Sequence, residues 1–288
     1  MNLFTGRLFF LAFVISLFSC NIINPVEPIP SYIKISSYEF VNTPNLNTGS
    51  LSNKITDAWV YIDNDPVGVF ELPFTIPVLK EGLHSIKIRP GIMQNGIAST
   101  RIEYPFYADY DTTINFAAEE THTIFPVFAY KSNTKFSLLE DFEGSGLKLE
   151  TSNASDTTLK HIKNNPIVFE GTGCGAGFLD DENILFEIVS SENLSLPKNS
   201  PVYLELNYRN ETDFSCGVYA NEPGQTNQYS SGLSINPSEN WNKIYVDMGL
   251  AIGSSLNASN YKLYIGALKT PDGTVKSIYL DNVKLVHW

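Results

Sequence analysis

Basic clusters, catalytic motifs and metal-binding spacings are all missing from this sequence of 288 residues. The formal net charge is −12 and no run of Lys or Arg interrupts that acidity, so the basic footprint that nucleic-acid binding requires is absent. The same acidity argues against charge-driven attachment to an anionic membrane. The 4 histidines show no metal-ligand spacing with one another or with cysteine. No Gly-x-Ser-x-Gly motif marks a nucleophilic serine.

Long amphipathic helical patterns are missing as well. Hydrophobic residues make up 43% of the chain, which is enough for a buried core, and the chain contains 15 Tyr and 18 Phe. They occur in short alternating runs that are separated by Asn, Gly, Pro and Asp, a pattern typical of strands and turns. The sequence therefore predicts an all-β protein.

The N-terminus carries the clearest signal in the sequence. Arg7 precedes an apolar run over 8–18, which is far shorter than the roughly 20 residues that span a bilayer and typical of a signal peptide. The run ends in Leu17-Phe18-Ser19-Cys20, which resembles the bacterial lipobox. The resemblance implies a signal peptide over 1–19, cleavage before Cys20, and acylation of Cys20. An ordinary signal peptide with a chance cysteine is the alternative.

Residues 20–31 form a short proline-rich segment after the predicted cleavage site. Its three prolines predict a stiff, extended tether between the lipid and the folded chain. The segment resembles that of Bacteroidota-type envelope lipoproteins, which implies a protein anchored in the cell envelope, on the outer membrane. Glu27 is the only acidic residue here, so the periplasmic and the surface-exposed face both stay open.

A first folded domain is predicted over 32–132. Its segment 58–68 reads as a hairpin, with Asn64-Asp65-Pro66 at the turn, and is followed by Glu81-Gly82-Leu83-His84 and Pro90-Gly91. This stretch resembles the PEGA-type surface module. The resemblance implies a small, Ig-like β-sandwich without catalytic activity.

A second domain is predicted over 136–288. Its opening, 138–144, and its close, 277–285, look like the first and last strands of a jelly roll. They are similar to the galactose-binding-like and carbohydrate-binding-module sandwiches. The whole chain is thus expected to hold two β-sandwich domains in tandem, the C-terminal one a jelly roll, with strands that include 166–170, 202–209 and 261–267.

The jelly-roll resemblance also suggests a metal. In modules of this type, acidic residues of the first and last strands often share a structural Ca²⁺, and Asp141, Glu143 and Asp281 occupy those positions. Carboxylates together with backbone carbonyls supply the six to eight oxygens that calcium takes. Solvated acidic side chains at a turn are the alternative.

Two cysteines remain once Cys20 is assigned to lipid. In an exported protein, Cys174 and Cys216 are expected either to form one disulfide or to stay as two buried thiols. Cys174 lies in a glycine-rich run over 171–177, which no helix pattern follows. The run therefore indicates a strand that bends or passes close to other backbone rather than a phosphate-binding loop.

A loop rich in tyrosine and amides is the candidate ligand site. Tyr219, Gln225, Asn227 and Tyr229 offer aromatic faces together with hydrogen-bonding groups that suit sugar hydroxyls. The same composition is common in exposed loops without a ligand.

These observations favour a non-catalytic, membrane-anchored envelope lipoprotein that binds a glycan or an envelope protein. The alternative is a structural accessory subunit of an envelope complex. A hydrolase is less favoured, because a glycosidase needs two carboxylates about 5–9.5 Å apart in a cleft and no motif marks such a pair.

Overall fold

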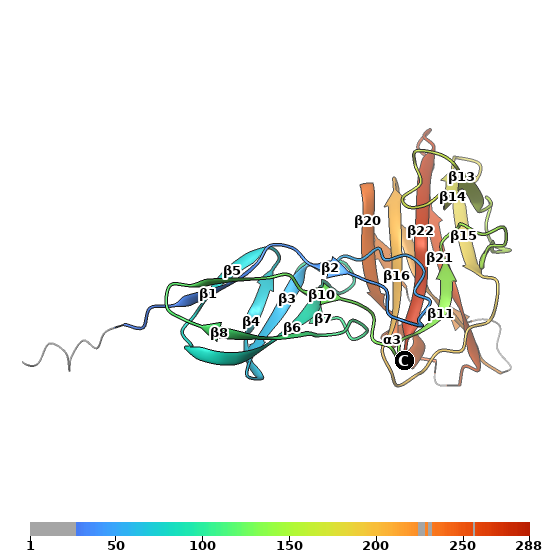
Figure 1. Cartoon of the computed structure of the whole chain (residues 1–288). Helices are drawn as coiled ribbons and strands as arrows, with labels where there is room; N and C mark the ends of the chain where they lie inside the picture. The colour runs from blue at the N-terminus through green and yellow to red at the C-terminus, as the bar shows by residue number, and fades with distance from the viewer. Residues whose placement is uncertain (1–26, 224–227, 230–231, 256) are drawn as a thin grey trace, which may run out of the picture.

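The computed structural model describes residues 27–223, 228–229, 232–255 and 257–288. The predicted signal peptide and Cys20 lie outside these residues, as do Gln225 and Asn227. Within the described part of the chain, no helix is both long and apolar enough to cross a bilayer. Almost every element is a strand, which confirms the all-β prediction (Figure 1).

The N-terminal domain packs a three-stranded sheet against a five-stranded one. The first has the order β5 (Phe74–Val78), β1 (Ser31–Ile35), β9 (Thr121–Ile124). In the second, β4 (Asp65–Glu71), β3 (Asp57–Ile62) and β6 (Gly82–Met93) are neighbours, and β6 also pairs with β7 (Arg101–Glu103) and β8 (Tyr110–Phe116). A small ladder joins β2 (Glu39–Phe40) to β10 (Val127–Phe128).

The hairpin predicted over 58–68 is present as β3 and β4. Its turn lies one residue earlier than predicted, at Asp63 and Asn64, whose φ angles are +55° and +69°. Asn and Asp tolerate this left-handed conformation better than other residues with a side chain, which suits a tight hairpin. The likeness of this stretch to the PEGA module stays a prediction.

The C-terminal domain is a sandwich of two six-stranded sheets. The β16 sheet contains β13 (Lys160–Lys163), β14 (Gly173–Leu179), β22 (Lys276–His287), β16 (Val202–Asn210) and β20 (Ser238–Asp247), with β11 (Lys135–Glu140) paired to β22. The β17 sheet contains β12 (Leu149–Thr151), β15 (Leu185–Ser190), β21 (Asn260–Leu268), β17 (Phe214–Asn221), β18 (Gln228–Tyr229) and β19 (Leu233–Ile235). A short helix, α3 (Gly249–Gly253), follows β20.

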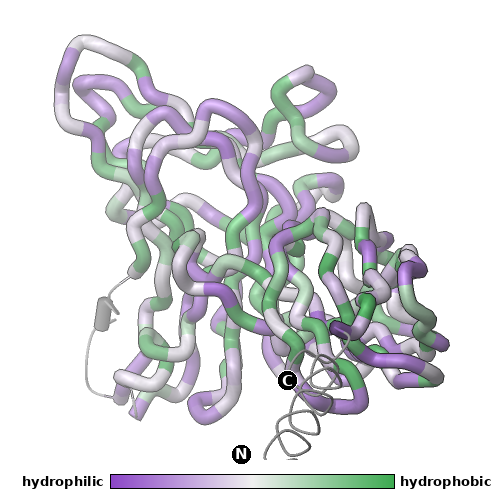
Figure 2. Tube along the Cα trace, turned by 90° about the vertical axis from the view of Figure 1, so that its left-hand side faces the viewer, coloured by the Kyte–Doolittle hydropathy of each residue, from purple (hydrophilic) through white to green (hydrophobic). Residues whose placement is uncertain are grey.

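The strands carry the expected alternation of inward and outward side chains. Hydrophobic and hydrophilic residues alternate along many extended segments (Figure 2). Leu204 and Leu206 of β16 are fully buried between the two sheets, where they meet Leu263 and Ile265 of β21 in one hydrophobic cluster. The segments predicted as the first and last strands of this domain are both strands, and they pair antiparallel: Glu140 of β11 lies opposite Val283 of β22.

Residues 173–177 of the glycine-rich run lie in strand β14 and make the predicted close approach. A Cβ atom on Gly173 would lie 2.1 Å from the carbonyl oxygen of Phe142, and one on Gly175 would lie 2.6 Å from the Phe142 ring. Only glycine fits there, because Phe142 is fully buried and has no room to retreat. The strand predicted over 166–170 is wrong, since these residues form the loop between β13 and β14.

A buried cluster of polar and aromatic side chains joins the two domains. The carboxylate of Glu205 on β16 is fully buried and accepts hydrogen bonds from the hydroxyls of Tyr104 (2.7 Å) and Tyr130 (2.9 Å). The ammonium of Lys243 lies 3.1 Å from the same carboxylate. Burial raises the pKa of both tyrosines well above 10, so they stay neutral donors. A buried charge requires such partners, and here the N-terminal domain supplies two of them.

Two further segments of the N-terminal domain lie against the jelly roll. The turn between β6 and β7 runs beside β20, where the amide of Asn95 donates to the carbonyl of Tyr245 (2.8 Å). The strap, residues 41–56, crosses the β16 sheet (Figure 1). Its Ser50 carbonyl accepts from the ammonium of Lys284 (2.5 Å), and its Lys54 amide donates to the hydroxyl of Tyr245 (2.8 Å). The N-terminal domain therefore covers part of the outward face of the β16 sheet and leaves the rest of that face open.

Candidate functional site

The candidate site is the uncovered end of the outward face of the β16 sheet. Along β16, Leu204 and Leu206 point into the sandwich core, whereas Glu205, Asn207 and Arg209 belong to the opposite, outward set. Glu205 lies beneath the N-terminal domain, and Asn207 is also buried. Arg209, at the far end of the strand, is only partly covered.

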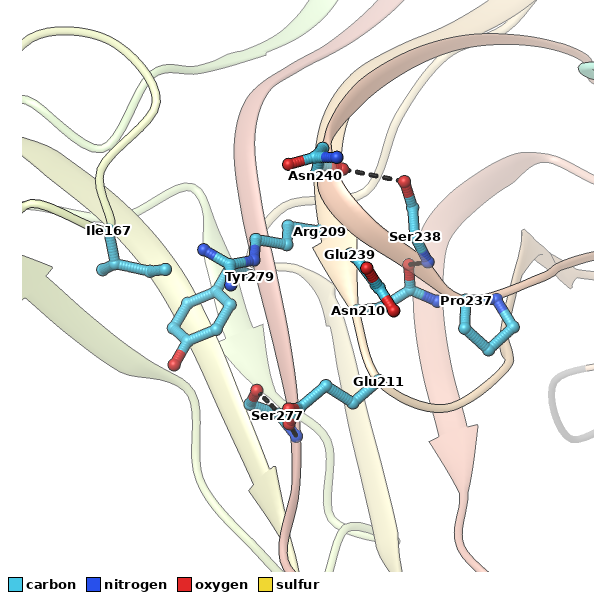
Figure 3. A pocket seen from close by; sticks show the side chains of 10 residues that line it. All are labelled: Ile167, Arg209, Asn210, Glu211, Pro237, Ser238, Glu239, Asn240, Ser277 and Tyr279. Atoms are coloured by element: carbon cyan, nitrogen blue, oxygen red, sulfur yellow. Dashed lines mark hydrogen bonds between the residues drawn. The ribbon is translucent and has the colours of Figure 1, made fainter.

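A groove of about 680 Å³ surrounds Arg209 (Figure 3). Strands β16, β20 and β22 provide its floor, and the loops beside them provide its walls. Its lining consists of Ile167, Arg209, Asn210, Glu211, Pro237, Ser238, Glu239, Asn240, Ser277 and Tyr279. Figure 3 places Arg209 and Tyr279 side by side in the view, with Glu239 and Asn240 on the β20 side.

Hydrogen bonds hold both walls of the groove in place. On one side, the indole N–H of Trp241 donates to the carbonyl of Ile167 (2.8 Å), and the ring of Phe169 lies 5.5 Å from that of Trp241. On the other side, the amide of Ser238 donates to the side-chain oxygen of Asn210 (3.0 Å). The groove is therefore preformed, as small-molecule sites usually are.

The charged groups in the groove differ in how far they are already engaged. Glu211 accepts hydrogen bonds from the amide (2.9 Å) and the hydroxyl (2.6 Å) of Ser277, and these bonds lower its pKa. Among the described residues, no hydrogen bond or ion pair engages the guanidinium of Arg209 or the carboxylate of Glu239. Arg209 thus presents five N–H donors in a fixed planar fork, and Glu239 presents acceptors.

An aromatic surface lies next to these polar groups. Tyr279 of β22 is partly exposed, and its ring meets that of Phe178 on β14 edge-to-face, with the centroids 6.1 Å apart. Phe178 is itself 36% exposed. An apolar ring beside a free guanidinium suits a ligand that has both C–H faces and hydroxyl groups.

The predicted calcium residues gather around one part of the domain junction. Asp141 and Glu143 line a second, smaller pocket with Glu170, and Asp281 is fully buried nearby. Glu143 accepts from the amides of Thr172 (2.8 Å) and Gly173 (2.9 Å).

The oxygens of Asp281 accept from the amides of Asn282 (2.8 Å) and Glu170 (3.3 Å). Burial raises the pKa of Asp281 to about 7, with Glu170 and Glu143 adding to the shift. No group of three or more His, Cys, Asp and Glu side chains arranged to hold a metal occurs in the described part of the chain. A calcium ion held by Asp141, Glu143 and Asp281 stays a prediction.

The two cysteines are both buried and both free. Cys174 lies on β14 in the β16 sheet, and Cys216 lies on β17 in the opposite sheet. The predicted disulfide is therefore not formed, and the alternative of two separate buried thiols describes the structure. Burial raises the pKa of Cys174 to about 11 and that of Cys216 to about 12, which keeps both thiols protonated and unreactive.

The predicted ligand loop starts on the other face of the jelly roll. Tyr219 lines a groove of about 470 Å³ on the outward side of the β17 sheet, where its hydroxyl donates to Glu187 (2.7 Å). The backbone of Tyr229 pairs with that of Tyr219, whereas Gln225 and Asn227 lie outside the described residues. A ligand at this loop stays a prediction.

Sequence reasoning missed the residues of the Arg209 groove. The alternation in 202–209 places Glu205, Asn207 and Arg209 on one face, and three polar residues in an apolar strand were the available signal. The sequence does not show which of these three side chains the N-terminal domain covers. That coverage decides which side chain remains accessible to a ligand.

No protein-family model matches this chain, and no curated protein matches it in sequence. Solved structures do resemble it in fold. A structure of carbohydrate-binding modules from the β-sandwich superfamily covers 91% of this chain and 99% of its own, with 11% identity and a TM-score of 0.41.

Two shorter structures resemble about half of the chain. The xylan-binding domain of carbohydrate-binding module family 22 covers 52% of this chain and 93% of its own, with 13% identity and a TM-score of 0.36. The K3 adhesin domain of Lys-gingipain from Porphyromonas gingivalis covers 54% and 99%, with 14% identity and a TM-score of 0.36. These likenesses concern the β-sandwich fold alone.

Proposed function

We propose that this chain is a non-catalytic lipoprotein of the bacterial cell envelope that binds glycan through the Arg209 groove. The observation that carries the proposal is a free guanidinium beside a partly exposed tyrosine ring in a preformed groove. The anchor is the acyl chains on Cys20, because the acidic chain offers no basic surface for electrostatic membrane binding.

The chemistry of the groove matches that of a sugar. A saccharide presents pairs of hydroxyl oxygens, which the fork of Arg209 meets as a planar double donor. Its hydroxyl hydrogens find acceptors at Glu239 and at the Asn240 side chain. Its apolar C–H face packs on an aromatic ring such as Tyr279. The mixture of polar groups with one apolar surface favours an uncharged or weakly acidic glycan.

Hydrolysis is disfavoured by the same groove. A glycosidase needs one carboxylic acid with a raised pKa to protonate the leaving group, beside a second carboxylate. The hydrogen bonds from Ser277 instead lower the pKa of Glu211, so that it is ionised at neutral pH and unsuited to donate a proton. Binding without bond cleavage is the function that these residues support best.

A glycan array probed with the mature chain tests this proposal. We expect binding to a restricted set of glycans, and loss of that binding in Arg209→Ala. Tyr219→Ala is the matched control, because it removes a tyrosine from the groove on the opposite sheet. Blank arrays together with a blank pull-down from envelope extract would refute both glycan and protein binding.

The alternative function is a structural accessory subunit of an envelope complex. The buried Glu205 cluster favours it, since such a junction holds two domains in one fixed arrangement, as a spacer requires. Co-purification of one partner at fixed stoichiometry, unaffected by Arg209→Ala, would favour this function over glycan binding.

A further inference from the structure

One end of the N-terminal domain carries exposed apolar side chains that its core does not use. We call Ile29, Leu79 and Leu83 the apolar tip; they are 54%, 65% and 72% exposed. The pairing of Ser31 with Val78 sets the segment before β1 next to the turn after β5. That turn leads directly into β6, which begins at Gly82. The three side chains therefore belong to one end of the sandwich.

This end is opposite the junction with the jelly roll. Strand β6 starts at the tip, and the turn that follows it contacts β20 through Asn95. Its 12 residues, at a rise of about 3.3 Å each, separate the two ends by about 40 Å. The jelly roll therefore leaves the apolar tip uncovered (Figure 1).

The position of the predicted lipid decides what meets the tip. Ile29 comes only nine positions after Cys20, so even a fully extended chain between them reaches about 30 Å. Of the two ends of the N-terminal domain, the tip is thus the one held close to the bilayer. Three exposed aliphatic side chains at that place gain free energy when they leave water for the lipid interface.

We infer that the apolar tip rests on the bilayer surface, with Ile29, Leu79 and Leu83 entering the boundary between headgroups and acyl chains. This inference rests on the proposed acylation of Cys20. With the tip on the bilayer, the N-terminal domain acts as a spacer that holds the Arg209 groove away from the membrane.

The charges around the tip show that the contact is apolar rather than electrostatic. Lys80 (3.2 Å) and His84 (2.5 Å) both lie against the carboxylate of Asp63, so these groups already have an acidic partner within the domain. Glu81 and Glu120 are exposed nearby and would repel anionic headgroups. Neutral lipid is therefore sufficient, and salt leaves the contact unchanged.

The test uses the full lipidated chain in phosphatidylcholine vesicles with a nitroxide spin label at Leu83→Cys. The label reacts there alone, because lipid occupies Cys20 while Cys174 and Cys216 are buried. The readout is accessibility to oxygen relative to a water-soluble nickel complex. The control is Val275→Cys on the jelly roll, where the side chain is 64% exposed.

We expect the oxygen-to-nickel ratio to rise several-fold at position 83 when vesicles are added, and to stay unchanged at position 275. Water-like values at position 83, equal lipid contact at both positions, or loss of the contact in 1 M salt would overturn the inference. The mass of the mature N-terminus reports acylation separately. An acylated chain with a water-exposed tip thus refutes the tip contact and leaves the proposed anchor standing.

Discussion

Glu205 and Arg209 lie on the same face of the same strand, yet they have opposite surroundings. Glu205 is fully buried, with two tyrosine hydroxyls and one ammonium around its carboxylate. Arg209, four residues on, is half-buried; no described group makes a hydrogen bond or ion pair with its guanidinium, whose charge helps to lower the pKa of Glu211. The difference comes from what lies above the sheet: the N-terminal domain covers one end of the face and stops before the other. A single strand thus supplies both the domain junction and the candidate binding groove.

Breaking the covered end should have the largest effect. Glu205→Ala leaves Tyr104, Tyr130 and Lys243 without their shared acceptor in a buried interface. We expect a loss of about 3–5 kcal/mol in the free energy of unfolding, because removing one partner of a buried ion pair leaves the other charge uncompensated. Urea denaturation measures this. Glu239→Gln, at the uncovered end, should change the free energy of unfolding by less than about 0.5 kcal/mol. Equal losses in the two variants would show that the two ends of the sheet face do not differ in this way.

A pH titration probes the same covered end through Lys284. Burial, with Lys243 nearby, lowers the pKa of Lys284 to about 7. Between pH 7 and its unfolded-state pKa near 10.4, the unfolded chain holds a proton that the folded chain has released, so stability rises with pH. We expect a rise on the order of 1 kcal/mol per pH unit from pH 7 to 9, seen in urea midpoints. Lys284→Met should flatten it, and an unchanged slope in that variant would assign the rise to another group.

Removing the guanidinium of Arg209 should weaken glycan binding without destabilising the fold. For Arg209→Ala we expect glycan affinity to fall at least about tenfold, or 1.4 kcal/mol, because a double hydrogen bond is lost. Unfolding free energy should stay within about 0.5 kcal/mol of the wild type, since no described group pairs with the guanidinium. Calorimetric titration measures the affinity. Arg209→Lys, which keeps the charge without the fork, should recover only part of it; full recovery would mean that charge alone suffices.

The smallest effect is expected when Tyr279 loses its hydroxyl but keeps its ring. Tyr279→Phe keeps the apolar face, so we expect affinity to drop no more than about threefold. Tyr279→Ala removes the face and should cost more than tenfold, by the same titration. Equal losses in the two variants would show that the hydroxyl, and not ring packing, provides the contact.

Much of the fold follows from local pattern. The alternation in 202–209 identifies β16, and the strand predicted over 261–267 is present as β21. The glycine run marks a close approach that the packing of Phe142 makes necessary. The strand predicted over 166–170 is wrong because Ile167 and Phe169 belong to a loop that covers Trp241 rather than to a sheet. A short apolar run alone does not distinguish a strand of a sheet from a loop that packs on the protein surface.

The groove could not be predicted in the same way. Alternation assigns Arg209 to a face of its strand, but the partner that would cover that face is a different domain, joined through Tyr104 and Tyr130. Contacts between residues some hundred positions apart leave no local pattern. The free cysteines show the same limit, because their spacing in the sequence allows a pair that their placement in opposite sheets does not form.

Chemical-shift mapping of the isotope-labelled mature chain, titrated with the glycan selected on the array, shows directly whether the Arg209 groove is where the glycan binds. We expect the perturbed signals to cluster at Arg209, Asn240 and Tyr279, and Arg209→Ala to remove them. Perturbations centred on Tyr219 and Glu187, in the groove of the opposite sheet, would contradict it.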